Sequence, residues 1–367
     1  MKKIIAVICT VLTFTVLSGC TPKVKNNAAG PSAAARTTAA ETSPAPVPVP
    51  EVLNLQDYFP LKENVKYIYA GKGNEYAAYT VLTDYVERNK VQQRINNGGT
   101  ETVRVIELKD GKLTRLLSKA ETYYRENLLE ADAGEEEILL KEPVVTGNTW
   151  KLKDGSTRTI TDTSAEISTT LGSFEALEVT TESTKGKTTD YYVKDMGLAK
   201  TVFRTGNEEV SSTIEKIEDK VYLKQSINFY YPKTASQKLY FVRREINFKT
   251  NDITKKLLEE TYKGIIREQS GKDYGAGVKT NSLYLNKDNR VYIDFNSALI
   301  TEIDKAALSA PYEKLVLQSI ANTVGGYYNV KNVIITVENK PYKSKNLTYG
   351  RGEPVKAELE NAIEEEK

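Results

Sequence analysis

A chain of 367 residues is too long for one small core and long enough for two domains of ordinary size. Hydrophobic residues make up 40% and charged residues 27%, which excludes a wholly disordered chain and a protein with many membrane spans. The formal net charge is +2, and removal of Lys2 and Lys3 with the N-terminal segment leaves 49 basic and 49 acidic side chains. The overall charge therefore gives no reason to expect nucleic-acid binding.

Two residue types that carry much enzyme chemistry are scarce. The chain has no histidine, and its only cysteines are Cys9 and Cys20. This removes Ser-His and Cys-His nucleophilic systems, imidazole acid–base chemistry and zinc sites built with histidine. Any catalysis would depend on carboxylate, Lys, Tyr, Ser or Thr side chains. We therefore expect a protein that is not an enzyme, with no catalytic residues, no cofactor and no metal site.

The N-terminus has the features of an export signal. Lys2 and Lys3 precede an apolar run over residues 4–16, which is long enough for a signal peptide and too short for a membrane span. The run closes with Leu17-Ser18-Gly19-Cys20, which resembles the bacterial lipobox. This pattern predicts a signal peptide over residues 1–19 and lipidation of Cys20, with diacylglycerol on the thiol and palmitate as an expected acyl chain. The alternative is an ordinary signal peptide followed by an incidental cysteine.

Residues 20–52 form a low-complexity stretch of Ala, Thr, Ser, Pro, Asn and Lys. Its end alternates proline over residues 44–50, which favours extended polyproline II. Such a segment cannot bury enough apolar surface to fold, so we expect a disordered tether that reaches at most roughly 100 Å. It would hold the folded domains away from a bilayer, on the extracytoplasmic face of the cell membrane.

Residues 53–222 alternate short runs of strand-forming residues with turn signals such as Asp110-Gly111 and Asp154-Gly155. No helix of three turns is predicted before residue 245. The pattern predicts an antiparallel all-β domain of ten or more strands, in the form of a curved sheet or half-barrel. Such a sheet can enclose a ligand, as lipocalin-like folds do, or serve as a packed spacer.

Residues 223–345 mix strands and helices, and residues 346–367 read as a charged C-terminal tail. The predicted order is β, β, α, β, β, α, β, an α+β sandwich with helices on one face of a sheet. Asn251-Asp252 caps the first helix, and Gly325-Gly326 is expected to end the second. The predicted strands cover residues 227–231, 238–246, 282–285, 290–295 and 330–337, with a turn at Pro232-Lys233.

Residues 225–342 carry a resemblance to a known family. The hairpin that contains Val291-Tyr292-Ile293-Asp294-Phe295 resembles the central hairpin of the GerMN domain. The helix over residues 312–324 and the strand after it are similar to the closing elements of that domain. Residues 279–281, Lys-Thr-Asn, depart from the family, since many members place a proline there. The resemblance implies a protein of sporulation or spore germination that acts through protein–protein contacts and has no known catalytic residues.

Other features have simpler explanations than a site. Asp294 lies between apolar neighbours in a strand, where an acid on the polar face is ordinary. Tyrosine pairs could stack on sugars, although adjacent strand residues point to opposite faces and strand propensity accounts for most of them. Glutamate runs at residues 135–137 and 364–366 are expected to be solvated, because no EF-hand spacing surrounds them.

Three functions remain, in descending order. The first is a membrane-anchored lipoprotein that contacts envelope or sporulation proteins through its GerMN-like domain, with self-assembly as a second form of contact and no nucleic-acid partner. The second is a carrier whose β domain holds a lipid, a peptide or a cell-wall fragment. The third is a wall hydrolase, which would need two carboxylates about 5–10 Å apart in one cleft.

Overall fold

The computed structural model describes residues 53–132, 134, 136–270 and 275–365. The predicted signal peptide, Cys20 and the predicted tether lie outside the described residues. Among the helices of the described part, none is long and apolar enough to cross a membrane.

The first folded region is a single antiparallel sheet of twelve strands, as the sequence predicts. Its order is β6-β5-β4-β3-β2-β1-β12-β11-β10-β9-β8-β7, so two meanders meet where β1 pairs with β12. Tight turns set the register. Asp110 and Gly111 both have positive φ, the geometry that a two-residue hairpin turn between β4 and β5 requires. The strands are β1 (Val65–Lys72), β2 (Tyr79–Glu87), β3 (Lys90–Asn96), β4 (Glu101–Lys109), β5 (Lys112–Lys119), β6 (Glu137–Lys141), β7 (Thr149–Lys151), β8 (Thr157–Thr169), β9 (Gly172–Ser183), β10 (Gly186–Val193), β11 (Gly197–Thr205) and β12 (Glu208–Asp219).

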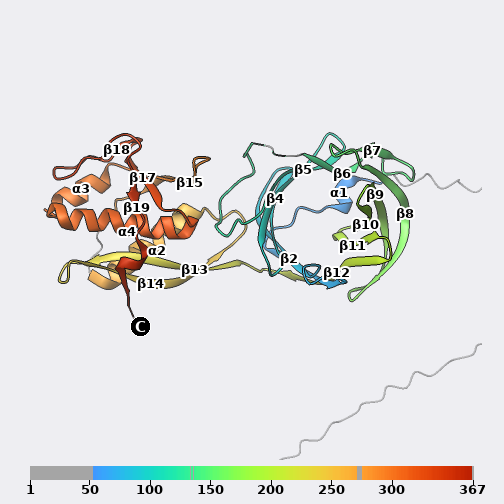
Figure 1. Ribbon diagram of the computed structural model, residues 1–367, viewed down its shortest axis with the longest axis horizontal. Coiled ribbons are helices and arrows are strands. Elements are labelled where there is room, and N and C mark those ends of the chain that lie inside the picture. The colour runs from blue at the N-terminus through green and yellow to red at the C-terminus, as the bar shows by residue number, and fades with distance from the viewer. Residues whose placement is uncertain (1–52, 133, 135, 271–274, 366–367) are drawn as a thin grey trace, which may run out of the picture. The chain divides into compact units, whose positions relative to one another are not determined.

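The sheet curls around on itself (Figure 1), and side chains join its two ends. Arg158 of β8 donates to the backbone carbonyl of Ile138 at 2.7 Å and pairs with Glu137 at 2.8 Å. The indole of Trp150, in edge strand β7, donates to the same carbonyl at 3.1 Å. The short helix α1 (Leu55–Tyr58) packs inside the curl among buried side chains of the sheet.

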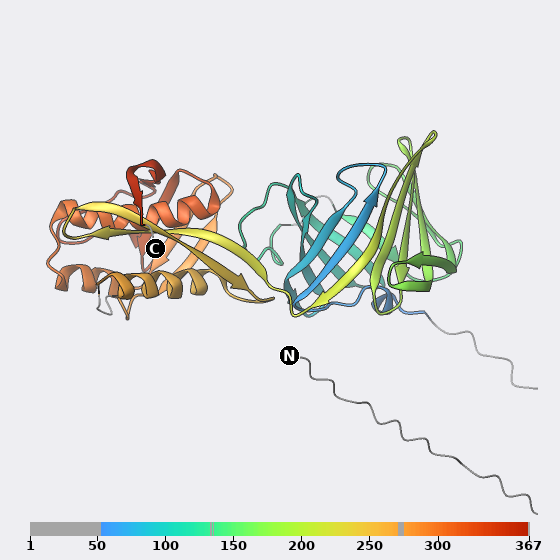
Figure 2. The same cartoon turned by 90° about the horizontal axis from the view of Figure 1, so that it is seen from below.

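The C-terminal region is α+β, which confirms the predicted class, but it contains two sheets. The first has the order β13-β14-β20 and the second β15-β16-β17-β18, with β19 paired to β17. Helix α4 lies between them and contacts both (Figure 1). The long, twisted β13–β14 hairpin is clearest in Figure 2. The elements are β13 (Leu223–Lys233), β14 (Lys238–Phe248), α2 (Thr254–Ser270), β15 (Thr280–Leu285), β16 (Val291–Phe295), α3 (Ala298–Lys305), α4 (Ala310–Tyr328), β17 (Asn332–Val337), β18 (Lys340–Pro341), β19 (Val355–Lys356), η1 (Leu359–Asn361) and β20 (Ala362–Glu364).

Helix α4 is buried on almost every side and not only along an apolar stripe. Small polar residues supply the additional buried face. Thr323, for example, accepts a hydrogen bond from the backbone N–H of Tyr230 at 3.0 Å. The helix does not end at Gly325-Gly326 but continues to Tyr328, and the left-handed residue Asn329 caps it. Gly325 permits close packing, because a Cβ there would lie 2.6 Å from the Cβ of Ala357.

Three smaller predictions differ from the structure. Pro232 and Lys233 do not turn but extend β13, which pairs with β14 up to Lys233 and Lys238. Helix α3 was not predicted. Residues 346–365, expected as a charged tail, contribute two short strands and a 3-10 turn: β19 pairs with β17, and β20 pairs in parallel with β14.

Candidate functional site

The site residue predicted from the sequence, Cys20, lies outside the described residues. The structure does place Asp294, which is only 2% exposed rather than on an open polar face. Its carboxylate accepts hydrogen bonds from the side chains of Asn281 and Thr336, at 2.8 and 2.6 Å, and from the backbone N–H of Asn339 at 2.7 Å. Strand β16 lies between β15 and β17, so both of its backbone edges are paired. Asp294 therefore has a structural role, because its carboxylate accepts three hydrogen bonds from the protein.

The two members of a tyrosine pair do not act together, and the pairs lie in different kinds of structure. Tyr123 is exposed and Tyr124 is buried, but both lie in the loop between β5 and β6, so strand propensity does not explain this pair. Tyr327 and Tyr328 lie in helix α4, so the strand explanation is wrong for that pair. Among the described residues, no group of three or more acidic side chains is arranged to hold a metal ion.

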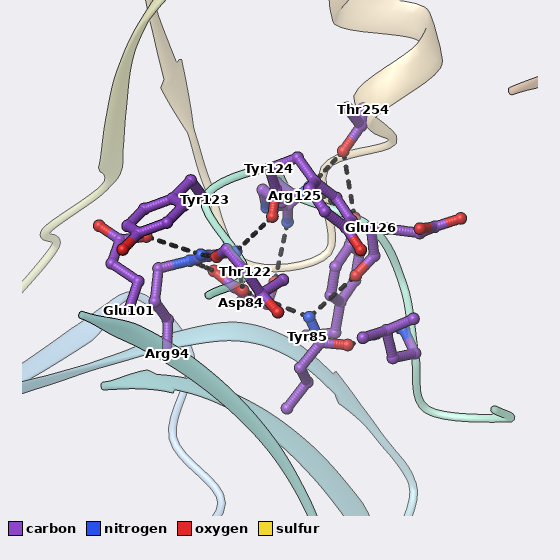
Figure 3. Close-up of polar contacts among 12 residues, drawn as sticks. Asp84, Tyr85, Arg94, Glu101, Thr122, Tyr123, Tyr124, Arg125, Glu126 and Thr254 are labelled. Carbon is purple, nitrogen blue, oxygen red and sulfur yellow. Dashed lines mark hydrogen bonds and ion pairs between the residues drawn. The ribbon is translucent and has the colours of Figure 1, made fainter. Parts of the chain in front are cut away.

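A buried ion-pair cluster fixes the loop that follows β5 (Figure 3). Arg94 of β3 pairs with Asp84 of β2 at 3.0 Å and with Glu101 of β4 at 2.8 Å, and both Arg94 and Asp84 are almost wholly buried. Arg94 also donates to the backbone carbonyls of Thr122 and Tyr124. These acidic partners raise the pKa of the guanidinium against the opposing effect of burial. The charged Arg94 therefore fixes the backbone of residues 122–124.

The next residue in this loop, Arg125, is completely buried and connects the two folded regions (Figure 3). Its guanidinium donates to the carbonyls of Asp84 and Lys249, at 2.8 and 2.9 Å, and to that of Asp252. It also donates to the hydroxyl of Tyr85 at 2.7 Å and lies 4.1 Å from the centre of that ring. One side chain thus satisfies polar groups on β2 and on the segment between β14 and α2.

Two tyrosines extend this connection into the core of the C-terminal region. Tyr124, from the β5–β6 loop, packs 4.8 Å from the ring of Tyr328 and belongs to the buried cluster around α4. The hydroxyl of Tyr327 accepts the backbone N–H of Arg125 at 2.8 Å and lies 3.0 Å from the side-chain oxygen of Gln225. Burial raises the pKa of Tyr327 well above its ordinary value, so its phenol stays neutral.

We call these residues, Arg94, Tyr124, Arg125 and Tyr327, the junction. Its polar groups are hydrogen-bonded to the protein itself, except for the buried Nε of Arg125, which has no partner among the described residues, and none resembles an activated nucleophile or a general base. What the arrangement does is hold the sheet and the C-terminal region together through buried contacts. Sequence reasoning missed it because Arg125 lies in a loop with no motif, and nothing in the sequence distinguishes it from a solvated arginine.

A groove of about 610 Å³ lies beside the junction. Two of its lining side chains are exposed apolar residues, Ile253 at 47% and Tyr284 at 40%. Glu126 also lines it, and burial raises the pKa of this carboxyl to about 7, against the lowering effects of the Leu285 N–H and Lys119. The groove therefore combines an apolar surface with one carboxyl group that titrates near neutrality.

Side chains cover part of the strand edge next to this groove. Strand β15 is at the end of its sheet. The Glu259 carboxylate of α2 accepts the backbone N–H of Thr280 at 2.6 Å, and Lys255 donates to the carbonyl of Asn281. Covering an edge in this way discourages the addition of a foreign strand. This surface therefore presents the exposed side chains of Ile253 and Tyr284 rather than a free strand edge.

The fold is thus that of an α+β domain held by buried contacts on a curved antiparallel sheet. Residues 228–343 of this α+β domain match the family model described as Germane: Sporulation and spore germination. This confirms the GerMN resemblance, and a Germane domain occupies that part of the chain.

Solved structures similar to this chain include an inferred lipoprotein from Parabacteroides distasonis ATCC 8503. It is 15% identical, and the match covers 44% of this chain and 98% of that one, with a TM-score of 0.28. An exported protein with a YmcC-like fold from Bacteroides fragilis NCTC 9343 is 12% identical, with coverage of 44% and 98% and a TM-score of 0.26. An inferred lipoprotein from Clostridium perfringens is 20% identical, with coverage of 37% and 87% and a TM-score of 0.21. The comparison with curated proteins gave no match.

Proposed function

We propose that this chain is a lipid-anchored, extracytoplasmic protein of the cell membrane that acts without catalysis. It would hold its Germane domain in contact with envelope proteins during sporulation or spore germination. The observation that carries the proposal is the Germane match over residues 228–343, a domain whose description names these two processes. The lipobox at residues 17–20 supports the anchor.

The junction supports a positioning role for the curved sheet. A buried arginine that bonds to carbonyls of both regions resists hinge motion, because opening would leave several buried polar groups without partners. The sheet and the Germane domain would then move as one body on the tether. This is the arrangement expected of a protein that presents a binding surface at a fixed geometry.

The contact surface that we propose is the groove with Ile253 and Tyr284. An aromatic and an aliphatic side chain beside a cavity are typical anchors of protein interfaces. A photo-crosslinking residue at position 284 should capture envelope proteins from sporulating cells. The same residue at position 171, an exposed leucine in the β8–β9 turn, is the matched control. Equal capture at both positions, or none at 284, would contradict this surface.

The anchor has its own test. Cys20→Ala should release the protein from the membrane fraction, whereas Cys9→Ala, which changes the apolar segment of the signal, should leave it there. Retention of the Cys20→Ala protein in membranes after cleavage of the signal would count against lipidation.

A carrier role for the β domain remains the second candidate, for a lipid, a peptide or a cell-wall fragment. The observation in its favour is a pocket inside the curved sheet. Its walls carry several charged side chains, which favours a polar ligand over a lipid.

A further inference from the structure

The curved sheet contains a pocket of about 360 Å³ that is separate from the junction and from the groove. It rests against the apolar cluster around α1, with Phe59, Ile106 and Tyr192 on its floor. Its walls come from eight strands, β2, β4, β5, β6, β8, β9, β10 and β11. The volume is near the lower end of the range for small-molecule sites, which indicates a ligand of a few residues or fewer.

Five charged side chains line this pocket, and three of them, two arginines and one glutamate, form one ion-paired group with a net charge of +1. Glu137 pairs with both Arg115 and Arg158. The other two, Arg104 and Asp190, have only neutral partners among the described residues. Arg104 donates twice to the side-chain oxygen of Gln93, at 3.0 and 2.8 Å. Asp190 accepts one hydrogen bond, from the Thr201 hydroxyl at 2.6 Å. Arg104 and Asp190 are therefore one positive and one negative group outside any ion pair, beside an ion-paired group that is itself positive.

The pocket also offers fixed polar groups that no other part of the protein uses. The hydroxyls of Tyr79 and Tyr192 have no hydrogen-bond partner in the described part of the chain. The ring of Tyr79 is held by stacking on Tyr69, with centroids 4.4 Å apart. Tyr69 is in turn fixed by a 2.7 Å hydrogen bond to the carbonyl of Leu198. Burial keeps these phenols neutral, since it raises the pKa of Tyr79 to about 12. A neutral phenol can donate or accept a hydrogen bond.

Arg104 and Asp190 are both half-buried, and a charge that loses part of its water without gaining an ionic partner is costly in a folded protein. Here Arg104 and Asp190 share one small cavity with two free hydroxyls, and a ligand with opposite charges at its two ends would neutralise both. A lipid chain would leave them unpaired. We propose that the pocket binds a zwitterionic amino acid or dipeptide, with its carboxylate on Arg104 and its ammonium group on Asp190. This site does not depend on the proposed contacts of the Germane domain.

The test is isothermal titration calorimetry on the full chain in detergent, with the dipeptide Ala-Ala as probe. Two blocked probes remove one charge each: the C-terminal amide of Ala-Ala, and N-acetyl-Ala-Ala. Each missing charged hydrogen bond should weaken binding by about tenfold or more. The wild-type protein should therefore bind Ala-Ala saturably and both blocked probes less tightly.

Two variants test which residue of the pocket binds each charged end of the dipeptide. Arg104→Gln should weaken the binding of Ala-Ala and abolish the preference for a free carboxylate over the C-terminal amide. Asp190→Asn should also weaken the binding of Ala-Ala and should abolish the preference for a free amine over the N-acetyl group. Arg204→Gln, which removes an exposed arginine paired with Glu209 in the same sheet, is the control and should bind as wild type. The comparison of probes on the wild-type protein stands even where a variant fails to fold. Saturable binding that is equal for all three probes would overturn the proposal. So would the absence of any binding up to about 10 mM.

Discussion

Replacement of Glu126 by glutamine should stabilise the protein at pH 8 and much less at pH 5. The Glu126 carboxyl lines the groove, and burial raises its pKa to about 7 in the folded state, from 4.5 for an ordinary glutamate. A raised folded pKa means that the folded state holds the proton more tightly than the unfolded state. The stability contributed by the neutral carboxyl is therefore complete below pH 4.5, is lost as the pH rises to about 7, and then stays constant.

The magnitude follows from the shift. The rise of the Glu126 pKa from 4.5 to about 7 corresponds to at most about 3 kcal/mol of unfolding free energy. Glu126 is partly exposed in the groove, and solvent screening reduces this to about 1–2 kcal/mol. Glu126→Gln removes the titrating group and keeps the shape, so the variant should gain about that much over wild type at pH 8.

Urea unfolding at pH 5 and pH 8, followed by far-ultraviolet circular dichroism, measures this difference. The control is Glu130→Gln in the same loop, because Glu130 is 80% exposed and forms only a surface pair with Lys90. That variant should change stability little at either pH. The reasoning would be refuted if Glu126→Gln destabilised the protein at pH 8, or if its effect were the same at both pH values.

Four further substitutions test the junction and the packing. Arg125→Met leaves the carbonyls of both regions without a donor. It should therefore lower the free energy of unfolding by about 3–5 kcal/mol and give two urea transitions, one for each region. A single transition at the wild-type midpoint would contradict the junction. Gly325→Ala should destabilise by about 1–3 kcal/mol in thermal or urea unfolding, because its Cβ would lie 2.6 Å from that of Ala357. Gly326→Ala has room and should stabilise by up to about 1 kcal/mol; equal effects at the two glycines would be inconsistent with this packing. Asp294→Ala removes the acceptor for three donors and should cost about 2–4 kcal/mol by the same measurement, and a neutral result would exclude its structural role.

Much of the fold could be predicted because local signals and the tertiary structure agree. Asp110-Gly111 forms the hairpin turn that its sequence favours, and the strands on either side pair as expected. The β15–β16 hairpin likewise forms between the strands predicted at residues 282–285 and 290–295. These features depend on residues adjacent in sequence, so one chain is enough to recognise them.

What escaped prediction depends on residues that are distant in sequence. Arg125 acquires its role from carbonyls at residues 249 and 252, which no local pattern connects to it. Gly325 appeared to end a helix, but it is a contact point for Ala357 instead. The arginines of the sheet pocket lie on separate strands and meet only when the sheet curls. Tertiary packing determines the environment of these residues in all three cases, whatever the local propensity of the segments.

The central claim is that the Germane domain acts through the groove in sporulation or germination. The most direct measurement replaces the chromosomal gene with one encoding Ile253→Asp and Tyr284→Asp and then counts heat-resistant spores and follows their germination. Both residues are exposed, so charge at these positions should leave the fold intact while disrupting an apolar contact. The account predicts normal amounts of membrane-bound protein together with fewer spores or slower germination. Wild-type spore numbers and germination, with the variant protein present at normal levels, would contradict it.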